Sequence, residues 1–232
     1  MTDRTDRTER RDAERLKDML AIIAEEAAET ASFTGREAFA PQVMEAMAKV
    51  PRHLFVPPGQ EPVAYVNGPL PIGYGQTISQ PFIVALMTDL LDLQPGMRVL
   101  EVGTGSGYQA AVLAELGAEV YSLEIGPELA RRAAEHLARL GYDRVHVKAA
   151  DGYEGWSEHA PFERIIVTAA APAVPPPLVD QLAPGGRLVI PVGAVHVGQT
   201  LAVVDKDAAG RVTERPVLPV AFVPLTRGNG GY

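Results

Sequence analysis

From residue 98 onward, short apolar runs alternate with longer segments in which apolar positions recur every three or four residues. The runs have the length of buried strands, and the spacing of the longer segments places apolar side chains on one face of a helix. This alternation predicts a doubly wound α/β fold with a mainly parallel, seven-stranded sheet covered on both faces and an antiparallel edge near the C-terminus. The expected strands cover 98–102, 119–125, 145–148, 164–168, 187–192, 201–205 and part of 217–223, and the expected helices cover 108–116, 127–140 and 177–182.

The N-terminal part has a different pattern. Helical spacing predicts helices from about residue 13 to 31, over 41–49 and over 82–91. Residues 1–12 repeat Thr-Asp-Arg and Thr-Glu-Arg with almost no apolar positions, so we expect a disordered charged arm there. The chain therefore divides into this arm, an N-terminal helical part with a long loop (13–80), and an α/β domain (81–232), which together form one compact unit.

The loop before residue 81 is rich in proline and glycine but also contains Tyr65, Leu70 and Ile72. Long loops inside compact domains are usually functional or disordered. Because apolar side chains are costly to leave in water, we interpret the segment as an ordered cover over a site.

Composition narrows the possible functions. Hydrophobic residues make up 47% of the chain, which favours a packed core over disorder. No apolar run reaches the roughly 20 residues of a membrane-spanning helix, and the charged N-terminus does not resemble a signal peptide. The formal net charge of −8 weighs against nucleic acid as the main partner, and the absence of cysteine excludes thiolate metal sites and cysteine nucleophiles. We expect a cytoplasmic protein with no membrane or nucleic-acid partner.

A glycine-rich turn joins the expected strand 98–102 to the expected helix 108–116. Glycine permits positive φ and a close ligand approach, and the helix start offers free N–H groups. A dinucleotide loop would place its third glycine at Tyr108, and the lysine of a P-loop is missing. The remaining pattern, E-x-G-x-G-x-G from Glu101 to Gly107, resembles the cofactor loop of methyltransferases that use S-adenosylmethionine. A tight turn that binds nothing is the alternative.

Acidic residues lie at three strand ends, where ligands bind in such sheets. Glu124 ends the second expected strand and can accept hydrogen bonds from both ribose hydroxyls, although an exposed strand-end charge is the simpler alternative. Asp151 and Gly152 follow the third strand, where an adenine edge would lie, but an Asp-Gly turn explains them nearly as well. Glu101 either faces a sulfonium cation or is structural.

Other chemistries find little support. The five histidines show no metal-ligand spacing, so no metal site is expected. The sequence has no G-x-S-x-G elbow, which makes Ser79 and Ser106 poor nucleophiles. Ser79 lies just before the expected helix at Pro81, where it either orients an anionic substrate or caps the helix.

Several motifs together make the resemblance specific, because the covering loop is not shared by methyltransferases in general. In chain order they resemble the signature of protein-L-isoaspartate O-methyltransferases, from about residue 51 to 225. The matching segments are Pro51–Pro57, Leu70–Pro81, Leu100–Ala111, Asp151–Gly152 with Gly155–Trp156, Ile165–Pro172, Gly185–Gly193 and Phe222–Leu225.

The resemblance implies transfer of a methyl group from S-adenosylmethionine to the free carboxylate of L-isoaspartyl residues in damaged proteins and peptides. The ester then closes to a succinimide without the enzyme, and part of it reopens to aspartate. A carboxylate is already anionic at neutral pH, so the reaction needs no general base, metal or covalent intermediate. We expect a monomer without a metal cofactor, although the sequence itself does not reveal the oligomeric state.

The residues implied by the resemblance fall into three groups. Ser79 is the catalytic residue. The cofactor-binding set is Ile78, Ser79, Gln80, Glu101, Gly103, Thr104, Gly105, Ser106, Glu124, Ile125, Asp151, Gly152 and Thr168, and the substrate-binding set is Tyr74, Ser79, Val223 and Thr226. The alternatives are a different S-adenosylmethionine enzyme, an NAD-dependent oxidoreductase and a non-catalytic binding module.

Overall fold

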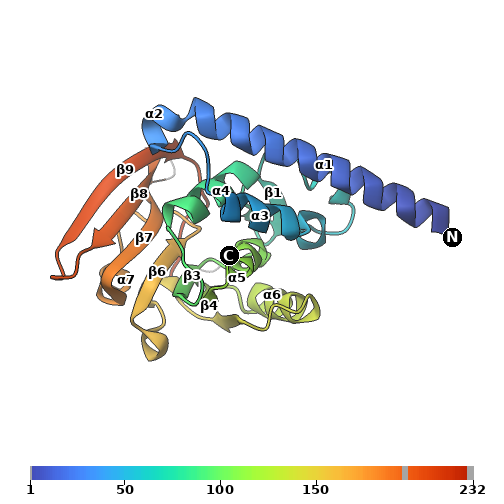
Figure 1. Ribbon diagram of the computed structural model, residues 1–232. Coiled ribbons are helices and arrows are strands. Elements are labelled where there is room, and N and C mark those ends of the chain that lie inside the picture. Colours follow the sequence, from blue (N-terminus) through green and yellow to red (C-terminus); the bar gives the residue numbers. More distant parts are fainter. Residues whose placement is uncertain (1, 195–197, 229–232) are drawn as a thin grey trace.

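A seven-stranded sheet forms the centre of the protein, as seen in a computed structural model that describes residues 2–194 and 198–228 (Figure 1). The strand order is β5-β4-β3-β6-β7-β8-β9, in which β5 to β7 run parallel and β8 and β9 are antiparallel additions. This arrangement confirms the predicted fold class and its antiparallel edge. The strands are β3 (Arg98–Val102), β4 (Glu119–Glu124), β5 (Val145–Ala149), β6 (Phe162–Val167), β7 (Leu182–Ala194), β8 (Gly198–Lys206) and β9 (Val212–Val220).

Helices cover one face of this sheet, and shorter elements cover the other. On the first face, side chains of α1, α3, α4 and α5 pack with Val99, Ile166 and Val189 in one apolar cluster. On the second face, Leu100 and Ile165 pack with Leu178 of α7 and with the aromatic side chains after β5. The central strands are buried on both faces, which explains their continuous apolar runs. The helices are α1 (Thr2–Glu29), α2 (Ala31–Thr34), α3 (Pro41–Lys49), α4 (Pro81–Leu90), α5 (Tyr108–Glu115), α6 (Pro127–Arg139) and α7 (Pro176–Asp180).

The first helix differs from the sequence-based expectation. It begins at Thr2 and continues without a break to Glu29, whereas the apolar spacing predicted a start near residue 13. Arginine and glutamate are good helix formers, and a pair such as Asp12–Arg15, at 3.2 Å, stabilises an exposed turn that has no apolar face. Burial starts only at Met19 and Ile23. The N-terminal end of α1 extends beyond the other elements (Figure 1).

The covering segment before α4 contains structure that the sequence pattern did not predict. A short antiparallel hairpin forms from β1 (Leu70–Gly73) and β2 (Gln76–Ile78), and single 3-10 turns lie at Arg52–Phe55 and Glu61–Val63. Tyr74 and Gly75 form its tip, both with positive φ. The segment is ordered, as expected from its apolar residues.

The last strand, β9, forms one edge of the sheet. It contains Pro216 and Pro219, and its register against β8 shifts between Leu201 and Ala202. The strands at this edge are longer than predicted, because the hairpins β7–β8 and β8–β9 extend past the apolar core into polar sequence. Among the described helices, none has the length and apolar character needed to cross a bilayer.

Candidate active site

A cavity lies at the carboxyl ends of β3, β4 and β6, roofed by the hairpin and the segment before α4. Ligands of such parallel sheets bind at this edge. The structure brings most of the predicted site residues together in the cavity wall. They are Ile78, Ser79, Gly103, Thr104, Gly105, Ser106, Glu124, Ile125, Gly152, Thr168, Val223 and Thr226.

The glycine loop after β3 forms the floor of the cavity. Gly103 has φ 100° and Gly107 has φ 86°, in the left-handed region that other residues rarely adopt. A Cβ atom on Gly103 would collide with the hydroxyl of Thr168, which donates to the Gly103 carbonyl at 2.7 Å. The loop therefore holds its backbone in a fixed, narrow turn against the end of β6.

The Glu124 carboxylate closes one side of the cavity. It is 5% exposed, and its Oε2 accepts a hydrogen bond from the Gly105 N–H at 2.9 Å. Its Oε1 accepts another from the Gly126 N–H at 3.1 Å, just before α6. Each carboxylate oxygen has a further lone pair, so the group can still accept hydrogen bonds from a ligand in the cavity.

Ser79 lies in the wall between this cavity and a second opening. It lines the cavity and also a groove between α4 and the segment after β9. Within the described chain its hydroxyl has no hydrogen-bond partner, and Gln80, not Ser79, occupies the N-cap position of α4 without a side-chain cap. Instead, the Oδ1 atom of Asn67 accepts a hydrogen bond from the Phe82 N–H, in the first turn of α4, at 3.0 Å. The capping alternative for Ser79 therefore has no support in the geometry.

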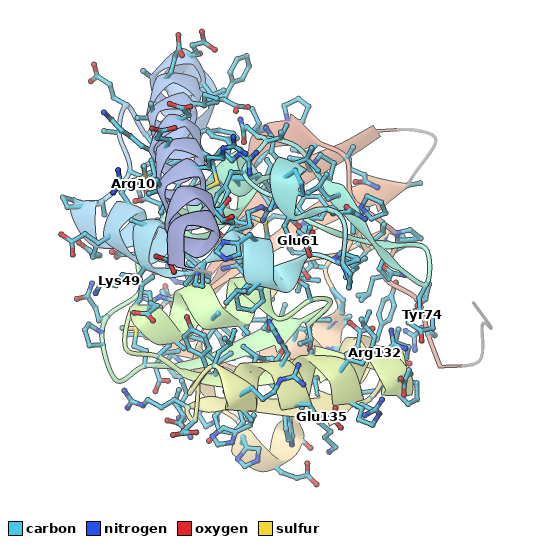
Figure 2. The ribbon with its side chains drawn as sticks, turned by 90° about the vertical axis from the view of Figure 1, so that its right-hand side faces the viewer. Arg10, Lys49, Glu61, Tyr74, Arg132 and Glu135 are labelled. Carbon is cyan, nitrogen blue, oxygen red and sulfur yellow. The ribbon has the colours of Figure 1, made fainter. Side chains whose placement is uncertain are left out.

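Four predicted residues lie outside the cavity wall. Gln80 faces the groove. Tyr74 is 44% exposed and its ring contacts the Arg132 guanidinium of α6 at 5.5 Å, on the outer side of the hairpin (Figure 2). Asp151 accepts from the N–H groups of Tyr153 and Gly228, at 2.9 and 3.2 Å. None of these three side chains lines the cavity, and their roles in binding stay predictions.

The fourth, Glu101, is buried behind the glycine loop and is fully inaccessible to solvent. Burial, and secondarily the charge of Glu124, raises the pKa of its carboxyl to about 8, against the hydrogen bond that Ser122 donates to it. The Ser122 hydroxyl also contacts that of Thr104 at 2.6 Å. Glu101 is thus mostly protonated at neutral pH and supports the loop from behind, which favours its structural interpretation.

Comparisons with known proteins agree on one family. The sequence model described as protein-L-isoaspartate(D-aspartate) O-methyltransferase matches residues 34–230. A protein-L-isoaspartate O-methyltransferase 2 from Syntrophobacter fumaroxidans is 60% identical over 91% of this chain and 85% of its own length. The chain belongs to the protein-L-isoaspartate(D-aspartate) O-methyltransferase family.

Solved structures of this family resemble the fold as a whole. One protein-L-isoaspartate O-methyltransferase superposes with a TM-score of 0.81 at 26% identity, covering 93% of this chain and 67% of that one. A Plasmodium falciparum protein assigned to the same activity, in complex with S-adenosyl-L-homocysteine, has a TM-score of 0.73 at 26% identity and covers 91% and 98% of the two chains. A curated relative from Cupriavidus necator is 59% identical over 90% of this chain and 80% of its own.

Sequence reasoning missed one residue that supports the site of this methyltransferase. Arg52 is completely buried, and its guanidinium donates to the carbonyls of Ala64 and Ser79 at 2.8 and 2.7 Å. It also lies over the Tyr108 ring, 4.7 Å from the centroid. Burial lowers the pKa of Arg52, and the Tyr108 ring and hydroxyl oppose that shift. An arginine inside the apolar segment Pro51–Pro57 was the available signal.

The described part of the chain contains no cluster of three or more histidine or acidic side chains able to hold a metal ion. The wall of the cavity offers backbone N–H groups, hydroxyls and a single carboxylate at its edge. Such a set binds and orients polar ligands.

Proposed function

We propose that this chain transfers a methyl group from S-adenosylmethionine to the free carboxylate of L-isoaspartyl residues in damaged proteins and peptides. One observation carries the proposal: Ser79 lies in the wall shared by the cavity and a neighbouring groove. A small cofactor and a polypeptide can therefore approach the same hydroxyl from two sides.

The residues of the cavity fit an S-adenosyl cofactor. The backbone turn at Gly103 and Gly105 requires positive φ, and Glu124 provides a carboxylate for ribose hydroxyls. A Cβ atom on Gly152 would collide with the side chain of Val102, so only glycine lets the backbone after β5 pack this closely against β3 in the cavity wall. When bound, S-adenosylmethionine supplies an electrophilic methyl group on a positively charged sulfur.

Ser79 is then the residue that orients the substrate carboxylate. Its hydroxyl donates a hydrogen bond to one carboxylate oxygen and leaves the other free to attack. Because Asn67 already accepts the N–H of Phe82, that backbone donor is occupied, and the donor that we assign to the carboxylate is the serine hydroxyl. The Arg52 guanidinium fixes the backbone of Ser79, because it donates a hydrogen bond to the Ser79 carbonyl oxygen at 2.7 Å. The contribution of the protein is alignment and exclusion of water, not proton transfer.

Methyl transfer to paired peptides that differ only in an isoaspartyl or an aspartyl residue tests the function. We expect the wild type to methylate the isoaspartyl peptide alone. Ser79→Ala should lower kcat/KM by about 30- to several-hundred-fold, the cost of one lost donor to an anion at about 2–4 kcal/mol. Cofactor affinity and melting temperature should stay unchanged, and Ser157→Ala, at an exposed serine, serves as the control.

Equal turnover of the two peptides by the wild type would refute the substrate assignment. A lower melting temperature of Ser79→Ala with turnover preserved would remove Ser79 from the site. Parallel binding measurements with S-adenosylhomocysteine and NAD separate this function from that of a dinucleotide-dependent oxidoreductase.

We also propose that the enzyme acts as a monomer in the cytoplasm and does not bind nucleic acid. The net charge of −8 supports the last point, since phosphate backbones are bound by basic surfaces. Light scattering of the purified protein measures its oligomeric state directly.

A further inference from the structure

The groove on the far side of Ser79 has one charged side chain in its lining. Its walls come from the start of α4, the segment Leu218–Val223 and the C-terminal end of α1. Most of the lining is apolar or uncharged, and Glu26 of α1 is the exception. A peptide that presents its carboxylate to Ser79 through this groove meets a negative charge beside it.

Contacts with the covering segment fix the position of the Glu26 carboxylate. Its Oε2 accepts a hydrogen bond from the Asn67 amide at 2.5 Å, and both its oxygens lie 3.3 Å from the Gln80 amide nitrogen. Asn67 in turn accepts from the Phe82 N–H of α4. The carboxylate is thereby held at the rim of the groove by neutral donors, and it forms no ion pair with any residue the structure describes.

Glu26 also contacts the residue next to Ser79. Gln80 follows Ser79 directly, so the carboxylate is one residue away from the donor proposed to hold the isoaspartyl group. Ser79 and Glu26 line the same groove, so an extended peptide bound at Ser79, which advances about 3.3 Å per residue, would pass Glu26 with a flanking residue. Because the Glu26 carboxylate is half-buried and has no cationic partner, it attracts a basic side chain of the substrate and repels an acidic one.

We propose that Glu26 is a specificity-determining residue that favours isoaspartyl substrates with a lysine or arginine next to the damaged residue. This inference rests on the proposed function, because it assigns a role to the groove that leads to the same Ser79. Glu26 precedes residues 34–230, which match the family's sequence model, so the preference belongs to the N-terminal helix of this chain and not to that matched region.

Three isoaspartyl peptides that differ at a single flanking position, occupied by lysine, glutamine or glutamate, test the proposal. For the wild type we expect kcat/KM to fall from the lysine to the glutamate peptide by about fivefold or more, as expected for one partly shielded ion pair. Glu26→Gln keeps the shape and one acceptor oxygen for the amides of Asn67 and Gln80 but removes the charge. It should bring the ratio of kcat/KM for the lysine peptide to that for the glutamate peptide close to one.

Glu25→Gln provides the matched control, because Glu25 is the preceding residue of the same helix and is exposed to solvent. It should retain the wild-type ratio. Glu26→Lys should reverse the order of the lysine and glutamate peptides, and melting curves of all variants exclude a loss of fold as the cause. An unchanged ratio in Glu26→Gln, or an equal loss in Glu25→Gln, would overturn the assignment of Glu26.

The two proposals fail in different ways. If the wild type methylates the glutamine peptide but does not distinguish lysine from glutamate, the role of Glu26 is refuted and the proposed function stands. If no isoaspartyl peptide accepts a methyl group while S-adenosylhomocysteine binds normally, the proposed function is refuted and the preference with it.

Discussion

Replacement of Glu124 probes the cofactor end of the site. In the structure its carboxylate bridges the N–H groups of Gly105 and Gly126 and borders the cavity. Glu124→Ala removes both the bridge and the acceptor that we assign to the ribose hydroxyls. Glu124→Gln keeps the shape but replaces one acceptor oxygen with an NH₂ group that faces a backbone donor.

The expected magnitudes follow from these contacts. Hydrogen bonds to a charged acceptor contribute about 1.5–3 kcal/mol each, and two hydroxyls share this carboxylate. Allowing for the water that replaces them, Glu124→Ala should weaken cofactor binding by about 2–4 kcal/mol, or roughly 30- to several-hundred-fold in Kd. Glu124→Gln should lose about half of that free energy, because one oxygen remains.

Titration calorimetry with S-adenosylhomocysteine measures both variants. Glu158→Gln is the control, since Glu158 is an exposed acid that pairs with Lys148 away from the cavity. Melting curves without ligand report any loss from the broken bridge to Gly105. Equal affinity of Glu124→Ala and the wild type, with the fold intact, would show that the carboxylate does not bind the cofactor.

Two further predictions concern stability. The folded pKa of Glu101 is about 8 against an ordinary value of 4.5, so between these values the folded state keeps a proton that the unfolded state loses. The free energy of unfolding should therefore fall by up to about 1.4 kcal/mol per pH unit as pH rises through this window, and urea titrations of Glu101→Gln should lack that slope. Deletion of residues 1–11 should leave melting temperature and turnover unchanged, because residues 8–11 are exposed; a large fall in either would show that this part of α1 docks or assembles the enzyme.

The order and type of the sheet elements could be predicted because each strand or helix has its own apolar pattern over consecutive residues. Helix α3 (Pro41–Lys49) has the predicted bounds, since a proline starts it and apolar residues follow at helical spacing. The hairpin β1–β2 was missed because its strands are short and contain Pro71 and Gly73, which disfavour a strand interpretation. The extension of β9 was missed because its first residues are polar and do not show the pattern of a strand. These residues become a strand by pairing with β8, which is a tertiary interaction.

The predictable part of the site is the part formed by consecutive residues. The spacing of the glycines after a strand predicts the glycine loop, and the end of the next strand predicts Glu124. The motif Leu70–Pro81 predicts Ser79. The support for Ser79 comes from Arg52 and Asn67, which lie 27 and 15 residues from Ser79 and Phe82, their respective partners. No local pattern indicates that a distant asparagine accepts the first N–H of a helix in place of the nearby serine. For Tyr74 the motif predicted a substrate-binding residue, but the side chain packs on Arg132 and does not line the cavity.

The two prolines of β9 bear on how this molecule behaves among unfolded chains. An edge strand normally offers a row of N–H and C=O groups on which another strand can grow. Pro216 and Pro219 carry no N–H, and the register shift beside them interrupts the regular spacing. A polypeptide that meets this edge finds two of the nine positions of β9 without an N–H donor. The free edge of the sheet is therefore a poorer template for the strands of other chains.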